Sequence, residues 1–135
     1  MKTTPRRVAA RLLPAGFLSA CLLAASAGAQ AQCLSDAKDR EALAGVVSTG
    51  QFRDAAGRPQ SAFILTLKTP ACLDSDDADM RVKQTLRVHI YSTRETVHAQ
   101  IRQRVGKSVR VRGKPFGAHT GHHHAPIVMD VAVVE

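Results

Sequence analysis

The feature that most constrains the fold is a series of five short segments with the residue pattern of β-strands, interrupted once by a helical segment. The clearest strand is RVKQTLRVHIYS at 81–92, in which apolar residues fall on one face and charged or polar residues on the other. Such alternation is typical of a strand with one buried face and one face in water. The other strand patterns lie at 43–50, 61–68, 107–113 and 127–134.

The helical segment lies between the third and fourth strands. It opens with STRE at 92–95, which has the pattern of a capping box. Val97, Ile101 and Val105 recur at every fourth position and form an apolar stripe, and Gly106 ends the segment. The resulting order, β-β-β-α-β-β, predicts an all-β fold with one helix, a five-stranded OB-fold-like barrel.

The first 31 residues have the composition of a secretory signal peptide. A basic start is followed by an apolar run and by two Ala-x-Ala cleavage patterns, which end at Ala29 and Ala31. We therefore expect residues 1–31 to be a bacterial signal peptide, and residues 32–135 to form one domain in the periplasm or outside the cell. LSAC, which ends at Cys21, also resembles a lipoprotein box, so a lipid anchor on that cysteine is the alternative.

Charge and composition limit the range of partners. Residues 32–135 keep 15 basic and 11 acidic side chains, a net charge of +4, whereas the whole sequence has +8. Single-stranded nucleic acid on an OB-fold needs aromatic side chains that stack on bases, and this sequence has few. We therefore expect an envelope protein or polymer, and not nucleic acid, to be the partner. The basic residues gather near the helix end and the fourth strand, at Arg102, Arg104, Lys107, Arg110, Arg112 and Lys114.

The two cysteines of the expected domain are Cys33 and Cys72. An even number of cysteines in an oxidising compartment predicts a disulfide. Their wide spacing lacks the Cys-x-x-Cys pattern of a redox centre. The sequence therefore predicts a structural bridge between them.

Four of the six histidines lie within six positions of the stretch GKPFGAHTGHHHAP, residues 113–126, which joins the last two strands. This connection is one of the two loops with which OB-folds commonly bind ligands. The histidine spacing would also suit a Zn, Cu or Ni ion, with His119, His122 and His124 as ligands and His89 or an aspartate from 74–79 as a further one. A purely structural loop, whose rings bond the backbone, is the other alternative. The candidate contact residues are Phe116, His119, Thr120, His122, His123 and His124.

The stretch GKSVRVRGKPFGAHTGHHHAPIVMDV at 106–131 resembles the C-terminal signature of a bacterial domain-of-unknown-function family, DUF4431. The resemblance lies in a Gly-Lys-x-Val strand, a later Phe and a Thr-x-His-His-His-x-Pro run. LTLKTPAC at 65–72 and CLSDAKDREALAGVV at 33–47 resemble other parts of that family. The loop around Gly57 is shorter than in the family, and Pro115 stands where an aliphatic residue is usual. The resemblance implies the fold and export, and it assigns no activity.

No catalytic motif stands out: the sequence has neither Gly-x-Ser-x-Gly nor His-Glu-x-x-His. The aspartate-rich segment 74–79 lacks the glycine and the final glutamate of an EF-hand loop. We therefore predict that the protein is not an enzyme but an exported small binding or accessory module that uses the histidine-rich loop. The alternatives are a periplasmic transition-metal binding protein and a structural envelope protein with no small ligand.

Overall fold

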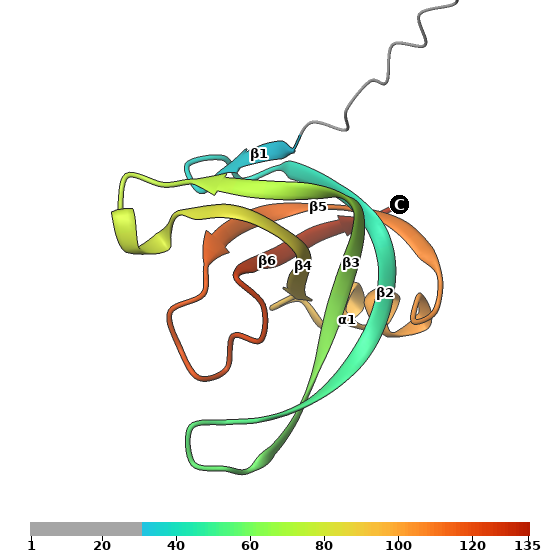
Figure 1. Ribbon diagram of the computed structural model, residues 1–135. Coiled ribbons are helices and arrows are strands. Elements are labelled where there is room, and N and C mark those ends of the chain that lie inside the picture. Colours follow the sequence, from blue (N-terminus) through green and yellow to red (C-terminus); the bar gives the residue numbers. More distant parts are fainter. Residues whose placement is uncertain (1–30) are drawn as a thin grey trace, which may run out of the picture.

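The computed structural model describes residues 31–135, so all but the last residue of the expected signal peptide, Cys21 included, lies outside the described part. No helix of the described part is both long and apolar enough to cross a membrane. The elements, shown in Figure 1, are β1 (Gln32–Ser35), β2 (Glu41–Arg53), β3 (Pro59–Asp74), the 3-10 turn η1 (Ala78–Met80), β4 (Val82–Tyr91), α1 (Glu95–Gln103), β5 (Ser108–Gly117) and β6 (Ile127–Val134).

Strands β2 to β6 close into a five-stranded barrel. β3 pairs antiparallel with β2 and β4, and β5 pairs antiparallel with β2 and β6. The parallel pairing of β4 with β6 completes the ring. Helix α1 lies between β4 and β5 in the chain, and its buried Val97 and Ile101 join the core. The structure thus confirms the predicted strand order, with the helix in its predicted place.

The core inside the barrel is aliphatic, as expected of a domain with so few aromatic residues. Alternate residues of the strands point into it because successive side chains of a strand face opposite sides. Its fully buried side chains include Leu65, Val88, Ile90, Val111, Met129 and Val131.

Strand β1 was not predicted. It pairs in parallel with the end of β3, which places Cys33 directly opposite Cys72. The two residues form the predicted disulfide, with their Cα atoms 4.4 Å apart. Leu34, the neighbour of Cys33, is 1% exposed and belongs to the core, so the bridge fastens a core side chain as well as a strand.

Strand β3 continues to Asp74, although we predicted its end at residue 68. The predicted strand stops before Pro70, because a proline often interrupts a strand. A proline has no N–H for the ladder but is tolerated at a bulge. The pairing of β3 with β4 shifts register between Thr66 and Ala71, and Pro70 lies within this irregularity.

Two local predictions on β4 and α1 were also wrong. Leu86, predicted to face the core, is 47% exposed because it lies opposite the register shift of β3, which interrupts the alternation. The predicted capping box does not form, because the helix begins at Glu95 and Ser92 lies two residues before its N-cap. The Ser92 hydroxyl instead donates to the carbonyl oxygen of Val131, 2.8 Å away. The residue that precedes the helix is Arg94, and it has no side-chain capping bond.

A second buried group lies on the outer side of the sheet. Ile64 of β3 pairs with His89 of β4, and His89 pairs with Val128 of β6, so the three share one face. Ile64 is 2% exposed and Val128 is fully buried, although both point away from the barrel interior. The loop of residues 118–126, which contains the buried Ala125, crosses this face.

Candidate functional site

The histidine loop, residues 118–126, joins β5 to β6 and folds back toward the sheet (Figure 1). Its base is closed by the Ala118 N–H, which donates to the Pro126 carbonyl at 3.0 Å. Its tip is a turn in which the His123 N–H donates to the Thr120 carbonyl at 3.1 Å. The Thr120 hydroxyl oxygen accepts from the backbone N–H of His122 at 3.3 Å. The loop is therefore held in shape by bonds within itself.

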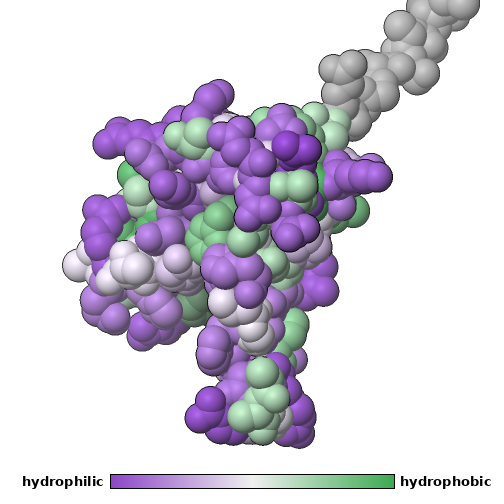
Figure 2. Space-filling view, turned by 90° about the vertical axis from the view of Figure 1, so that its left-hand side faces the viewer, coloured by the Kyte–Doolittle hydropathy of each residue, from purple (hydrophilic) through white to green (hydrophobic). Residues whose placement is uncertain are grey.

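A long extension of β2 and β3 reaches the histidine loop. We call residues 50–62 the hairpin arm; Figure 2 shows it projecting from the body of the molecule. At its tip, Asp54 accepts bonds from two backbone N–H groups and from the Arg58 side chain, which lowers the pKa of that carboxyl. Gly121 of the loop lies against Ala55, so close that an added Cβ would be 3.1 Å from the Ala55 Cβ.

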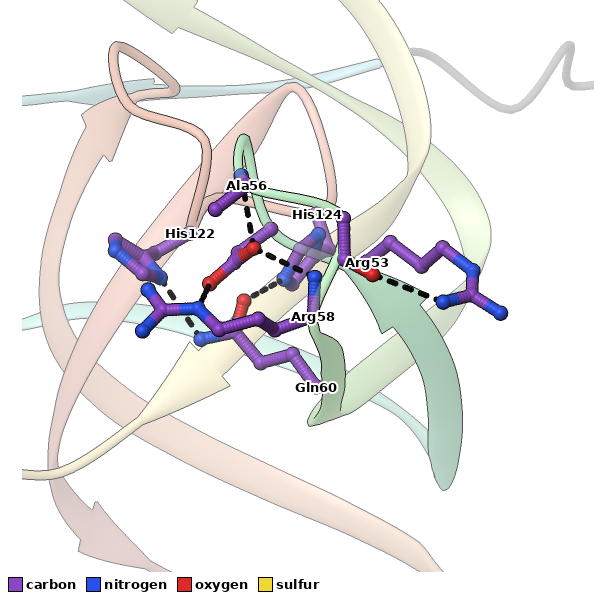
Figure 3. Close-up of polar contacts among 8 residues, drawn as sticks. Arg53, Ala56, Arg58, Gln60, His122 and His124 are labelled. Atoms are coloured by element: carbon purple, nitrogen blue, oxygen red, sulfur yellow. Dashed lines mark hydrogen bonds and ion pairs between the residues drawn. The ribbon is translucent and has the colours of Figure 1, made fainter.

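Gln60 of the hairpin arm bridges two histidines of the loop (Figure 3). Its amide nitrogen lies 2.8 Å from His122 Nδ1, and its amide oxygen lies 2.7 Å from His124 Nε2. Phe52 stacks on the His124 ring with 4.3 Å between centroids and 5° between planes. The arm thus fixes the position of both rings.

The hydrogen bonds also decide where the ring protons lie. His89 Nδ1 accepts from the His124 N–H at 3.3 Å, and His123 Nδ1 accepts from the His119 N–H at 3.0 Å. A neutral ring whose Nδ1 accepts must carry its proton on Nε2. With the Gln60 oxygen accepting from His124, the Gln60 amide donates to His122 Nδ1, so His122 also carries its proton on Nε2.

Two of these rings are held neutral by their surroundings. Burial, followed by the nearby His124 and His123 in their charged forms, lowers the pKa of His89 to about 4. Burial also lowers the pKa of His123, followed by the effects of His119, His122 and His124. Both shifts follow from the cost of placing a charge in a partly desolvated cluster of groups that become positive together.

A groove of about 400 Å³ opens between the hairpin arm and the histidine loop. A second hollow of about 200 Å³ lies beside it, next to Phe63 and to His98 of α1. The two share Ser61, Ala62, His89 and Tyr91 in their walls. β3 and β4 are the second and third strands of the barrel, and the groove lies on their face. It lies between the loop that joins the first two barrel strands and the loop that joins the last two, where OB-folds commonly bind ligands.

The structure divides the predicted site residues into two groups. His122 and His124 meet through Gln60, and Thr120 and His123 join them in the wall of the groove. His119 packs instead against the His123 and Phe116 rings, at centroid distances of 4.7 and 5.7 Å.

Sequence reasoning missed Gln60 and Ser61, both on the hairpin arm. Gln60 contacts histidines that are 62 and 64 positions away in the sequence. An isolated glutamine in a hairpin carries no motif of its own. Only the observation that β2 and β3 extend past the end of β4 places it beside the loop.

The predicted metal site is not assembled in this conformation. Among the residues that the structure describes, no three His, Cys, Asp or Glu side chains are grouped to hold a metal ion. His119 Nδ1 lies 3.0 Å from the Gly117 carbonyl oxygen, whereas His122 and His124 are bonded to Gln60. The bonds of His119 and His122 occupy Nδ1 and leave Nε2 unbonded among the described residues, whereas a metal ion on His124 Nε2 would have to displace its bond to Gln60. Metal binding there stays a prediction.

Carboxylates pair with much of the predicted basic surface. Glu135 lies within 3.6 Å of both Arg110 and Arg112, and Asp39 lies 3.5 Å from Lys114. These partly exposed pairs contribute little to stability, but they reduce the positive potential of β5. The basic side chains are therefore a weaker candidate site than the groove.

We expect Gln60→Ala to lower the free energy of unfolding by about 1 kcal/mol, because two imidazoles lose a bridging partner. Nitrogen-detected NMR of the rings should show His122 losing its fixed tautomer. Urea denaturation measures the stability. Gln84→Ala, an exposed glutamine on β4, is the matched control and should change stability by less than about 0.5 kcal/mol. Equal stabilities and unchanged ring signals would show that the bridge does not order the loop.

Comparison with known families supports the resemblance seen in the sequence. No curated protein matches the chain. Residues 87–135 match the model of a family described as a domain of unknown function, DUF4431. The match runs from the second half of β4 through α1 and β5 to the end of the chain, and it includes the whole histidine loop. The hairpin arm and the disulfide lie before it. Residues 87–135 of the chain are thus similar to the DUF4431 family, whose function is unassigned.

Proposed function

We propose that the protein is an exported binding module that takes its ligand in the groove between the hairpin arm and the histidine loop. The observation that carries this proposal is the groove itself, about 400 Å³ of open volume on the face where OB-folds commonly bind. Its walls come from β3, β4 and the loop, and Gln60 holds the loop against the arm. A pre-formed wall loses little conformational entropy on binding.

Export is part of the same proposal. The N-terminal sequence has the pattern of a signal peptide, and the Cys33–Cys72 disulfide suits an oxidising compartment. We propose a periplasmic or extracellular location in a bacterium, with an envelope protein or polymer as partner. Nothing in the groove resembles a catalytic constellation, since no side chain there is an activated nucleophile beside a base. We therefore propose binding without catalysis.

A fragment screen by NMR tests the groove. With the isotope-labelled full chain, we expect small neutral and charged fragments to shift the amide signals of Ser61, Tyr91 and His123 before other signals. Ser61→Trp should remove these shifts, because Ser61 lies in the wall of both hollows and the indole would fill them. Lys83→Trp, at an exposed site on β4, is the control and should leave the shifts intact. Shifts that scatter over the surface, or that persist in Ser61→Trp, would refute the proposal.

A structural role of the loop is the second candidate, and one observation favours it. The ring nitrogens Nδ1 of His122 and His123 are bonded to groups of the arm and of the loop, and that of His119 to the carbonyl of Gly117 at the end of β5. A protein in which Gln60→Ala is destabilising, while no fragment reaches the groove, would fit this role.

A further inference from the structure

The walls of the groove contain no side chain that carries a permanent charge at neutral pH. Their polar groups are amide, hydroxyl and imidazole groups, and no Lys, Arg, Asp or Glu is among them. The ion pair at the tip of the arm, Asp54 with Arg58, joins opposite charges at 2.7 Å. Such a wall favours a ligand that is itself uncharged, because a charge on the ligand would meet no counter-charge in the wall; Asp130, the partner of Tyr91 in β6, lies outside it.

Three rings offer hydrogen-bond donors toward a ligand. His89, His122 and His123 each carry an Nε2–H, and none of these groups has a bond partner among residues 31–135. No described side-chain nitrogen or oxygen is both buried and unpartnered, so the Nε2 groups of His89 and His123 reach solvent. They are free to donate to hydroxyl or carbonyl oxygens. Because burial keeps these two rings neutral at pH 7, they donate without adding positive charge.

Tyr91 supplies an aromatic surface at the centre. It lies in the walls of both hollows, with one polar neighbour, His89, at 6.2 Å and one apolar neighbour, Phe116, at 6.3 Å between ring centroids. Such packing fixes the ring plane while leaving Tyr91 partly exposed. A tyrosine combines an apolar face with a hydroxyl that can bond a ligand. The apolar C–H face of a sugar ring is a natural complement to it.

We propose that the two hollows form one binding site for a neutral oligosaccharide, with a sugar ring against Tyr91 and sugar oxygens on the Nε2–H groups of His89 and His123. The proposal rests on the binding function proposed above and gives that function its ligand class. The hollows are adjacent and together fall within the roughly 300–1,000 Å³ of ligand pockets, so the site accepts more than one sugar ring.

The test is a calorimetric and NMR titration of the full chain with defined oligosaccharides. The neutral probes are cellotetraose, maltotetraose and the trimer of N-acetylglucosamine, and the anionic probe is tetragalacturonate. We expect at least one neutral probe to bind, to bind more tightly than its monosaccharide, and to shift Tyr91 and His89. Raising the salt concentration from about 0.05 to about 0.5 M shortens the electrostatic screening length roughly threefold. This change should leave the affinity for the neutral probe unchanged.

Variants locate the site. Tyr91→Ala should weaken binding of the neutral probe at least tenfold, and Ser61→Trp should abolish it. The Ser61 variant keeps the test valid if loss of the tyrosine unfolds the chain, since it adds a side chain at an exposed position. Leu86→Ala, on the exposed part of the same strand, is the matched control and should bind as the parent does.

The remaining outcomes overturn the inference in distinguishable ways. Preference for tetragalacturonate, or affinity that falls with salt, would show an anion site. Absence of binding by every neutral probe would also refute the oligosaccharide assignment. If fragments still shifted Ser61 and Tyr91 in that case, the binding-module function would stand with another ligand, such as a peptide of an envelope protein. If they did not, both proposals would fail together.

Discussion

Replacing Cys33 and Cys72 together by alanine should lower the free energy of unfolding by about 4 kcal/mol. The two residues are 39 positions apart, and the loop that they close contains all of β2 and most of β3. Without the bridge, the unfolded chain regains the freedom of that loop, which is the main source of the expected loss. A domain of this size has a small margin of stability, so the double variant should unfold at much lower urea concentration.

The loss of local stability should be largest at β1. This strand has four residues and pairs only with the end of β3, so the disulfide is its chief fastening. We expect amide exchange of Leu34 to become fast in Cys33→Ala/Cys72→Ala, while amides of the barrel strands lose protection only as far as the global stability falls. Reductant provides a matched control, because it should destabilise the parent and leave the variant unchanged. A stability loss below about 1 kcal/mol, with Leu34 still protected, would show that β1 is held by packing alone.

The barrel could be predicted because its strands carry their pattern locally. Val109 and Val111 alternate with arginines, which indicates a strand. Val97 and Ile101 repeat at helical spacing, which indicates a helix. In both segments the apolar positions predict the buried face. The order of these elements then leaves few closed topologies. The disulfide followed from the number of cysteines, and the structure confirms it.

The errors in the fold came from features that depend on pairing partners. Pro70 is compatible with β3 only because the pairing with β4 shifts register there. The same shift exposes Leu86, which the alternation alone assigned to the core. β1 has too few residues to show any period, and its place is set by β3 and by the bridge. No pattern within one strand contains this information.

The sequence predicts the position of the candidate site, but not the role of each residue in it. A loop with four histidines is visible in the sequence, but the role of each ring depends on residues from other elements. Gln60 decides the tautomers of His122 and His124, and the neighbouring sheet decides how deeply His89 is buried. The strand pattern predicted that His89 lies on a solvent-exposed face, whereas the histidine loop folds over that face and covers it.

Acidification should destabilise the protein through His89. The pKa of this ring is about 4 in the folded chain and 6.5 in a solvated one, so protonation favours the unfolded state. The stabilising contribution is complete above pH 6.5 and is lost as the pH falls from 6.5 to 4. A shift of this size corresponds to roughly 3 kcal/mol, and solvent screening at a half-buried site reduces the expected loss to about 2 kcal/mol.

His89→Gln isolates this contribution, because glutamine keeps an acceptor for the His124 N–H and does not titrate. Urea denaturation at half-unit steps from pH 7 to pH 4 should give a flatter curve for His89→Gln than for the parent. Gln84→Ala, on the same strand, should follow the parent curve. Carboxylates titrate equally in all three proteins, so the difference between the curves reports the imidazole alone. Parallel curves for parent and His89→Gln would mean that the ring is hydrated in solution, and the histidine loop would then not lie over β4 as the structure has it.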